Sequence, residues 1–399
     1  MLIIRSLLKY TKVGVVSLGC LLAGCTMLDD YMLGKDNQPA PAPLKKIEPK
    51  VVFKQQWMES VSPRSKQPTE LYKLKPALFG NAVYTASATG FVQARDQQSG
   101  QLIWSKDVNI GIASGPMVNE KMVVVGSNEA RVVALDRGNG RLLWQTPVSN
   151  QLLAPPIISN GKVLAKTIDG QLYAFNAYTG KRLWRYTHGA PNLILRASSS
   201  PVVSGSLVIS GFADGKVDAV DLNSGRLEWQ RNITYASGSS EVERLIDIDA
   251  TPVVRGGQVY VVSYQGEVSA LSLKDGHVMW QRKMSAYRDM AVTVNAIYVV
   301  DAKSQVWALS RQNGMVLWSQ KSLINRMLNA PTISRFGIIL SDRFGFVHVL
   351  SKLTGEEIAR DAISSQAVDS APVVKGSSIY LLQDNGVLTK LNMTARAIQ

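Results

Sequence analysis

The chain has few of the residues that build disulfide frameworks and metal sites. Its 399 residues include two cysteines, Cys20 and Cys25, and three histidines. We expect Cys20 to leave with a cleaved leader, so the mature chain can form no internal disulfide and must be stabilised by packing. His188, His277 and His348 are far apart in the sequence and have no cysteine near them, which is not a metal-ligand spacing. The sequence therefore predicts no metal site, and structural or surface roles for the histidines.

Signals for nucleotide and nucleic-acid binding are also weak. No glycine-rich loop follows a strand pattern and opens a helix pattern, as a phosphate-binding loop would. The formal net charge is +14, and a basic surface can attract nucleic acid or acidic lipids. The basic residues are dispersed, however, and Lys45-Lys46 is the nearest approach to a cluster. We therefore expect no nucleic-acid partner, and favour acidic lipids or an acidic protein.

What the chain does have is a regular series of tryptophans. Seven of them follow one another at intervals of 47, 40, 40, 45, 51 and 38 residues, and nearly every one comes four places after a glycine. They are Trp57, Trp104, Trp144, Trp184, Trp229, Trp280 and Trp318. This period is typical of repeat proteins, in which each unit must stack on the next to bury its apolar face. The fixed position predicts that the tryptophans pack between units and do not serve as stacking platforms for a ligand.

Each repeat unit has the pattern of a small antiparallel sheet. Before each tryptophan stands the sequence Ala-x-Asp/Ser, three residues, Gly, three residues, Trp, as in Ala134, Asp136, Gly140 and Trp144. A proline followed by β-branched residues precedes this, as in Pro252-Val253-Val254. Short alternating runs separated by Gly, Asn and Asp turns predict four strands joined by hairpins. A four-stranded unit of this length repeated around an axis is a β-propeller blade.

The two ends of the repeat array complement each other. The unit around Gly355 has Ala359 at the tryptophan position but keeps the phase, and the last unit supplies only three strands. Val51 to Trp57 resembles a final strand without the three that should precede it. The sequence therefore predicts an all-β, eight-bladed propeller over residues 51–399, with four antiparallel strands per blade. The N-terminal strand would close the ring and remove an exposed sheet edge.

The first residues have the pattern of an export signal. A basic start leads into an apolar stretch that is too short for a stable membrane span. The run Leu22-Ala23-Gly24-Cys25 resembles a bacterial lipobox, which implies cleavage of residues 1–24 and acylation of Cys25; the alternative is an ordinary cleavage site with a coincidental cysteine. Residues 25–50 would then be a lipidated cysteine and a proline-rich tether. Thr26 in place of an aspartate favours outer-membrane sorting, with the protein on the periplasmic face.

Two protein families share these features. The repeat Ala-x-Asp-x-x-x-Gly-x-x-x-Trp resembles that of the quinoprotein dehydrogenases, eight-bladed propellers that carry pyrroloquinoline quinone (PQQ). That resemblance implies a PQQ-dependent enzyme as an alternative function. The chain lacks the adjacent cysteines that many of these enzymes place over the quinone, and it has little length beyond the blades for active-site loops. A shared scaffold does not carry function.

The second resemblance covers nearly the whole chain. The lipobox, the proline-rich tether and eight such repeats resemble BamB, the lipoprotein family of the outer-membrane β-barrel assembly machinery. This implies a non-enzymatic scaffold without a cofactor that helps outer-membrane β-barrel proteins to fold and insert. The implied partners are the POTRA domains of BamA and, as a further expectation, unfolded outer-membrane proteins captured at exposed strand edges.

The same resemblance implies a docking site in two connections between repeats. Leu193, Leu195 and Arg196 lie in one, and Asp247 and Asp249 in the next; the matching positions of the family contact the POTRA domains. An alternative is that the leucines pack beneath their own loop and Arg196 pairs with Asp247 or Asp249 inside the chain. Both can hold together, because an intrachain pair can orient a contact surface.

Membrane attachment should depend on Cys25 alone. Cys25→Ser removes the thiol that would be acylated, so the protein should appear in the soluble periplasmic fraction or remain unprocessed. Cell fractionation with immunoblotting measures this. A mature variant that stays with the outer membrane in cells depleted of the partner would show that no lipid on Cys25 is needed.

Overall fold

The computed structural model describes residues 39–61, 72–189, 199–234, 246–368 and 370–397. The chain divides into two compact units, Met1–Ala42 and Pro43–Gln399, and the fold described below is that of the second. Its regular structure, among the described residues, consists of strands. None of the described residues belongs to a helix that could span a membrane.

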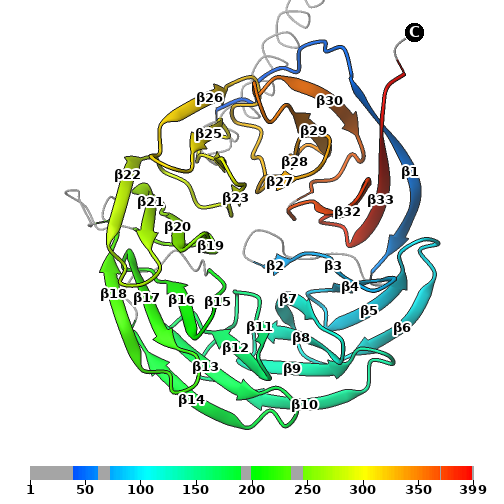
Figure 1. The fold of residues 1–399 in the computed structure, drawn as a ribbon. Helices are drawn as coiled ribbons and strands as arrows, with labels where there is room; N and C mark the ends of the chain where they lie inside the picture. The colour runs from blue at the N-terminus through cyan, green and yellow to red at the C-terminus, as the bar shows by residue number, and fades with distance from the viewer. Residues whose placement is uncertain (1–38, 62–71, 190–198, 235–245, 369, 398–399) are drawn as a thin grey trace, which may run out of the picture. The chain divides into compact units, whose positions relative to one another are not determined.

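Eight sheets of the described residues follow one another around a ring, as the repeat predicts (Figure 1). In each, the first strand lies near the axis and the last on the circumference. The first four blades contain β3 Ala77–Phe79, β4 Ala82–Ala86, β5 Phe91–Asp96 and β6 Leu102–Asp107; β7 Ile112–Val118, β8 Met122–Ser127, β9 Arg131–Asp136 and β10 Leu142–Pro147; β11 Ile157–Ser159, β12 Lys162–Lys166, β13 Gln171–Asn176 and β14 Arg182–Thr187; β15 Val202–Ser204, β16 Leu207–Gly211, β17 Lys216–Asp221 and β18 Leu227–Asn232.

The remaining blades repeat this order. They contain β19 Val253–Arg255, β20 Gln258–Val262, β21 Glu267–Ser272 and β22 Val278–Lys283; β23 Ala291–Val292, β24 Ala296–Val300, β25 Val306–Ser310 and β26 Val316–Gln320; β27 Thr332–Ile333, β28 Ile338–Ser341, β29 Phe346–Leu350 and β30 Glu357–Ala362; β31 Val373–Lys375, β32 Ser378–Leu382, β33 Val387–Ala395 and, from the other end of the chain, β1 Val51–Ser60. One short strand lies outside the scheme: β2, Lys73–Leu74, pairs in parallel with β7 and adds a fifth strand to the second blade.

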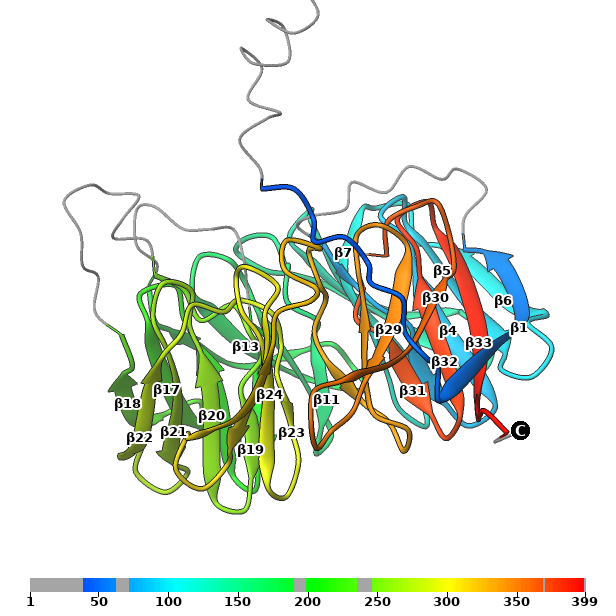
Figure 2. The same cartoon turned by 90° about the horizontal axis from the view of Figure 1, so that it is seen from above.

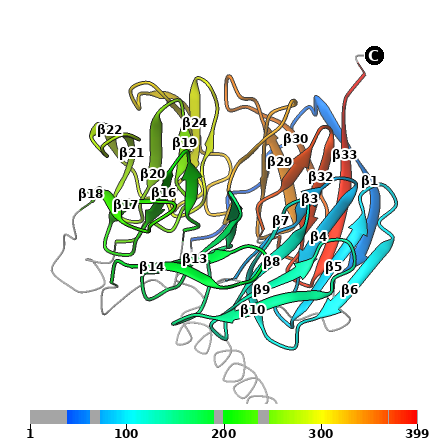
Figure 3. The same cartoon turned by 60° about the horizontal axis from the view of Figure 1, so that its bottom comes forward.

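The N-terminal strand closes the ring, as the sequence predicts. β1 is antiparallel to β33, with Val51 opposite Ala395 and Ser60 opposite Val387. Figures 2 and 3 show β1 running along β33 at the outer side of the last blade. The eighth sheet is thus built from both ends of the repeat array, which gives it the same four-stranded form as its neighbours.

The tryptophans lie between blades. The ring of Trp104 covers Gly140 of the next blade, and its indole Nε1 donates to the carbonyl of Arg137 at 2.9 Å. Gly140 has a φ of 72°, and a Cβ there would lie 2.6 Å from the indole ring. Glycine is therefore required for both the turn and the close contact. The other six tryptophans of the series cover equivalent glycines: Trp57 on Gly100, Trp144 on Gly180, Trp184 on Gly225, Trp229 on Gly276, Trp280 on Gly314 and Trp318 on Gly355.

Part of the segment expected to be tether lies against the propeller. Leu44 packs on the apolar cluster of the sixth and seventh blades, and the carbonyl of Lys45 accepts a 2.7 Å hydrogen bond from Arg360. The amide of Lys50 donates to Ile358 on β30 at 2.7 Å, and its carbonyl accepts from Arg396. Residues 44–50 therefore pack on the seventh blade, in which Ala359 takes the tryptophan position, and Lys50 also bonds Arg396 after the last strand of the eighth.

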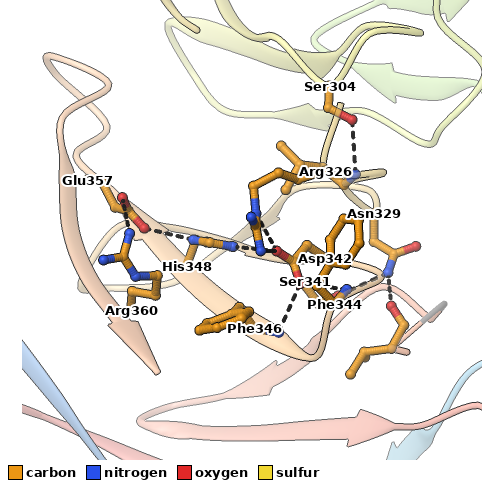
Figure 4. Close-up of polar contacts among 12 residues, drawn as sticks. Ser304, Arg326, Asn329, Ser341, Asp342, Phe344, Phe346, His348, Glu357 and Arg360 are labelled. Carbon is orange, nitrogen blue, oxygen red and sulfur yellow. Dashed lines mark hydrogen bonds and ion pairs between the residues drawn. The ribbon is translucent and has the colours of Figure 1, made fainter. Parts of the chain in front are cut away.

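Two of the three histidines are buried in charged networks. His348 is 0% exposed and lies between Glu357 (Nδ1 to Oε1, 2.7 Å) and Asp342 (Nε2 to Oδ2, 3.2 Å), as Figure 4 shows. Arg326 bonds the same Oδ2 of Asp342, and Arg360 bonds the other carboxylate oxygen of Glu357. Burial works against a charged imidazole, but the two carboxylates raise the pKa of His348 above its ordinary value. The network thus links the interior of the seventh blade to the arginine that holds Lys45.

His188 has a similar setting in the fourth blade. Its side chain is 3% exposed, bonds Asp214 at 3.0 Å and Asp218, and stacks on Phe212 with ring centroids 3.9 Å apart. Burial lowers its pKa, but the hydrogen bonds and charges of the two aspartates outweigh this and raise the pKa to about 9. His277, by contrast, is exposed.

The contact that closes the ring should contribute as much to stability as a contact between any two other blades. Trp57→Ala should destabilise the protein by ~3–5 kcal/mol, as should Trp144→Ala, because both remove a large aromatic side chain that packs on a glycine of the next blade. Leu317→Ala is the control, since that side chain is 56% exposed on β26, and it should cost less than about 0.5 kcal/mol. Urea unfolding measures all three. A Trp57→Ala variant as stable as Leu317→Ala would contradict closure by β1.

The His188 network should make stability pH-dependent. The folded pKa of about 9 lies above the ordinary value of 6.5, so the stabilisation is complete below pH 6.5 and is lost as the pH rises through 9. The protonation of His188 should therefore add about 3 kcal/mol to the free energy of unfolding of the wild type at pH 6, compared with His188→Gln. This difference should disappear by about pH 10. Unfolding curves of both proteins across this range measure the difference. A gap that does not change with pH would contradict a charged His188.

Candidate functional site

The predicted docking residues fall on two segments, of which one lies within the described residues. Leu193, Leu195 and Arg196 belong to residues 190–198, outside the described part of the chain. Asp247 and Asp249 belong to the described connection that leads into β19. The geometry of the site is therefore built from the second segment and the groups around it.

The connection at 246–250 is held in place by buried apolar side chains and by backbone hydrogen bonds. Ile246, Ile248 and Ala250 are buried, and Ile248 belongs to the apolar cluster of the fourth and fifth blades. The backbone is fixed from both flanks: Ile248 donates to the carbonyl of Phe212 at 3.3 Å, and the carbonyl of Asp247 accepts from the amide of Tyr264 at 2.8 Å.

Both aspartates are buried, although the resemblance implies that they contact a partner. Asp247 is 2% and Asp249 9% exposed. Asp249 is paired with Lys73, whose Nζ lies 2.6 Å from Oδ1 and 2.9 Å from the backbone carbonyl of the same residue. In the chain alone, these carboxylates face internal cations and offer little surface to a partner.

A second lysine completes a charge cluster, which consists of Lys73, Lys166, Asp247 and Asp249. The Lys73 side chain is 31% exposed, and the other three residues are buried. Lys166 ends β12 and is 5% exposed. Its ammonium donates to Ser199 Oγ at 3.0 Å and to the carbonyl of Gly211, and it lies 5.0 Å from the centre of the Phe212 ring. The cluster thus joins the extra strand of the second blade, the third blade and the connection between the fourth and fifth.

The charged groups of the cluster shift one another's pKa values. Burial lowers the pKa of Lys166 to about 8, although Asp247 and Asp249 favour its charged form. Burial and the charge of Asp249 raise the pKa of Asp247 to about 7, and its Oδ2 has no hydrogen-bond partner among the described residues. Burial also opposes the charge of Lys73, but Asp249, Asp289 and Asp247 together raise its pKa. Lys73 therefore remains a cation and balances Asp249.

Sequence reasoning did not identify either lysine. Lys73 lies outside the repeat, so a comparison of the repeat units could not single it out. Lys166 is the last residue of its strand that pairs with the following strand, where it lies opposite Leu172. The residues at the equivalent position of the other seven blades are uncharged: Ala86, Gly126, Gly211, Val262, Val300, Ser341 and Leu382. A comparison of the repeats position by position would have singled it out. No group of three or more potential metal ligands is present among the described residues.

The chain was compared with known proteins. Residues 88–320 match the family described as outer membrane protein assembly factor BamB. A protein of that name from Legionella pneumophila is 48% identical over 383 residues, which covers 96% of this chain and 99% of the relative. The crystal structure of BamB from Moraxella catarrhalis is similar with a TM-score of 0.78 and 26% identity, and the match covers 86% of this chain and 100% of that one.

The quinoprotein resemblance extends to solved structures as well. A quinohemoprotein alcohol dehydrogenase from Pseudomonas putida matches with a TM-score of 0.70 but 13% identity, over 89% of this chain and 78% of that chain. At such low identity the likeness concerns the fold alone. The propeller fold is shared by several families, but the family match and the near-full-length relative point to one of them. They show that the chain belongs to the BamB family of outer membrane protein assembly factors.

Proposed function

We propose that this chain is a non-enzymatic scaffold of the β-barrel assembly machinery, attached to the periplasmic face of the outer membrane by a lipid on Cys25. The observation that carries the proposal is 48% identity over 96% of the chain to a protein named as an outer membrane protein assembly factor. The lipobox Leu22 to Cys25 supports the anchor. Residues 25–50 would connect this lipid to the propeller, and Lys45 and Lys50 of this stretch bond to it directly.

The proposal assigns docking on the POTRA domains of BamA to the two connections. Leu193 and Leu195 would supply apolar area, and Arg196 a charge that fixes orientation. Asp247 and Asp249 belong to the same site but are buried in the chain alone. Their part in docking is therefore to hold the adjoining surface in position and to set its electrostatic potential.

The outer strands support a second role, in which the scaffold assists the folding of outer-membrane proteins. β6 and β26 form the outer edges of their sheets, and Leu102, Ile103 and Leu317 on them are 50%, 53% and 56% exposed. An edge with unpaired backbone groups and apolar side chains can accept an added strand from another chain. Unfolded β-barrel proteins supply strands with alternating apolar residues, which fits such an edge.

Docking should depend on the 191–196 connection. Leu195→Ala combined with Arg196→Ala removes an apolar anchor and a charge, so the affinity for the isolated POTRA domains should fall at least about tenfold, within the range for interface anchors. The melting temperature should stay nearly unchanged. Calorimetry or surface plasmon resonance gives the affinity, and circular dichroism the melting temperature.

A matched control replaces a leucine and an arginine elsewhere on the ring. Leu353 is 88% exposed and the Arg226 side chain 78% exposed, so Leu353→Ala with Arg226→Ala should leave both binding and folding unchanged. If the double variant of residues 195 and 196 binds normally while well folded, the partner docks elsewhere. Binding that falls only in proportion to lost folding would make these residues structural.

A further inference from the structure

A single lysine joins two segments that are far apart in the sequence. Lys73 Nζ donates to both the side chain (2.6 Å) and the backbone carbonyl (2.9 Å) of Asp249, 176 residues further along the chain. Two bonds to one residue fix the direction of its backbone as well as the position of its carboxylate. Charge-assisted bonds of this kind are shorter and stronger than neutral ones.

The backbone of Lys73 is itself firmly held. β2 pairs in parallel with β7, with Lys73 opposite Ser114 and Leu74 opposite Gly115. Leu74 is 8% exposed and packs in the apolar cluster of the eighth, first and second blades, and the amide of Lys75 donates to the carbonyl of Gly115 at 3.2 Å. The lysine thus extends from a rigid base on the second blade to the connection that leads into the fifth.

This base lies outside the propeller repeat. The β1, β33, β32 and β31 sheet closes the ring, and the β3 to β6 sheet forms the first blade, without any contribution from β2. Strand β2 adds to a blade that already has four strands. The second blade does not need β2 to be complete, and the strand instead places a cation beside the 246–249 segment.

We propose that Lys73 is a positioning residue for partner docking, which ties the 246–249 segment to the second blade and so holds the docking surface in its binding form. The inference rests on the proposed function, since it concerns the site through which the chain would bind BamA. It differs from direct contact because Asp249, at 9% exposure, would act through the lysine. Removal of the lysine would leave the buried Asp249 carboxylate without its 2.6 Å partner, and removal of the carboxylate would take away the charge that orients the lysine, so either change would release the segment.

A double-mutant cycle tests this. Lys73→Met, Asp249→Asn and their combination are made in the full-length protein, and the affinity for the POTRA domains is measured with the melting temperature. Each single change should weaken binding about tenfold, and the combination should be no weaker than the worse single, because residues that act as one unit are not additive. Lys73→Gln, which keeps a donor but removes the charge, provides the same comparison if Lys73→Met does not fold.

A matched control separates positioning from plain stability. Arg95 is another cation that ties distant segments, since it bonds Glu59 at 3.1 Å and the carbonyls of Ser60 and Gly100. Arg95→Met should lower the melting temperature as much as Lys73→Met but leave affinity unchanged. Equal losses of affinity in the two variants would overturn the proposal, as a merely structural lysine would produce them.

The remaining outcomes are equally decisive. Weaker binding by Asp249→Asn with normal binding by Lys73→Met would mean that Asp249 contacts the partner directly, which overturns the positioning role. Additive losses would mean that the two residues act independently and would overturn it too. If the wild-type protein itself does not bind the POTRA domains, the proposed function fails, and this inference with it; normal binding by both single variants overturns the inference alone.

Discussion

The structure depends on one repeated contact, in which an indole ring covers a glycine of the next blade. The contact buries a large apolar surface between sheets that could not be stable alone. It also satisfies the indole N–H with a backbone carbonyl, as in Trp144 to Ala177 at 2.7 Å. The glycine carbonyl is used as well: Thr146 donates to Gly180 at 2.8 Å, and Arg231 to Gly276 at 2.9 Å. One glycine therefore serves the turn, the ring contact and a hydrogen bond.

The junction between the seventh and eighth blades lacks this contact, and the N-terminal strand compensates for it. Ala359 takes the place of the indole. Val51 and Phe53 of β1 belong to the same apolar cluster as Ala359, while Trp57, further along β1, covers Gly100 of the first blade. A single strand thus packs on the blades at both sides of the closing sheet, which is why the chain before the first complete blade is part of the fold.

The fold could be predicted from the sequence because the repeat phase is a local signal. Each Ala, Gly and Trp recurs at the position where the same contact is made, so a one-dimensional pattern defines the ring, its blade count and its closure. The docking of residues 43–50 could not be predicted in this way. It depends on Arg360 reaching the carbonyl of Lys45 across 315 residues, and a backbone carbonyl carries no sequence signature.

The same limit applies to the candidate site. Asp247 and Asp249 were identified by resemblance to a family, and nothing in their spacing predicts that both are buried. The cation of Lys73 that balances Asp249 comes from β2, a short strand outside the repeat, so no repeat-based reasoning connects the two. Lys166 is different, because a charge at an otherwise uncharged phase is visible in the sequence once the repeats are aligned.

These departures from the repeat are where function should be sought in a propeller. The regular contacts give every blade the same form, so they cannot distinguish one side of the ring from another. The charge cluster of Lys73, Lys166, Asp247 and Asp249 does, since it stands at one place and joins three segments that the repeat leaves independent. Buried charges cost desolvation free energy that apolar residues of similar size would avoid. Lys166, Asp247 and Asp249 are nevertheless buried in a ring already stabilised by seven indole contacts, which favours a role for this cluster in holding a specific surface.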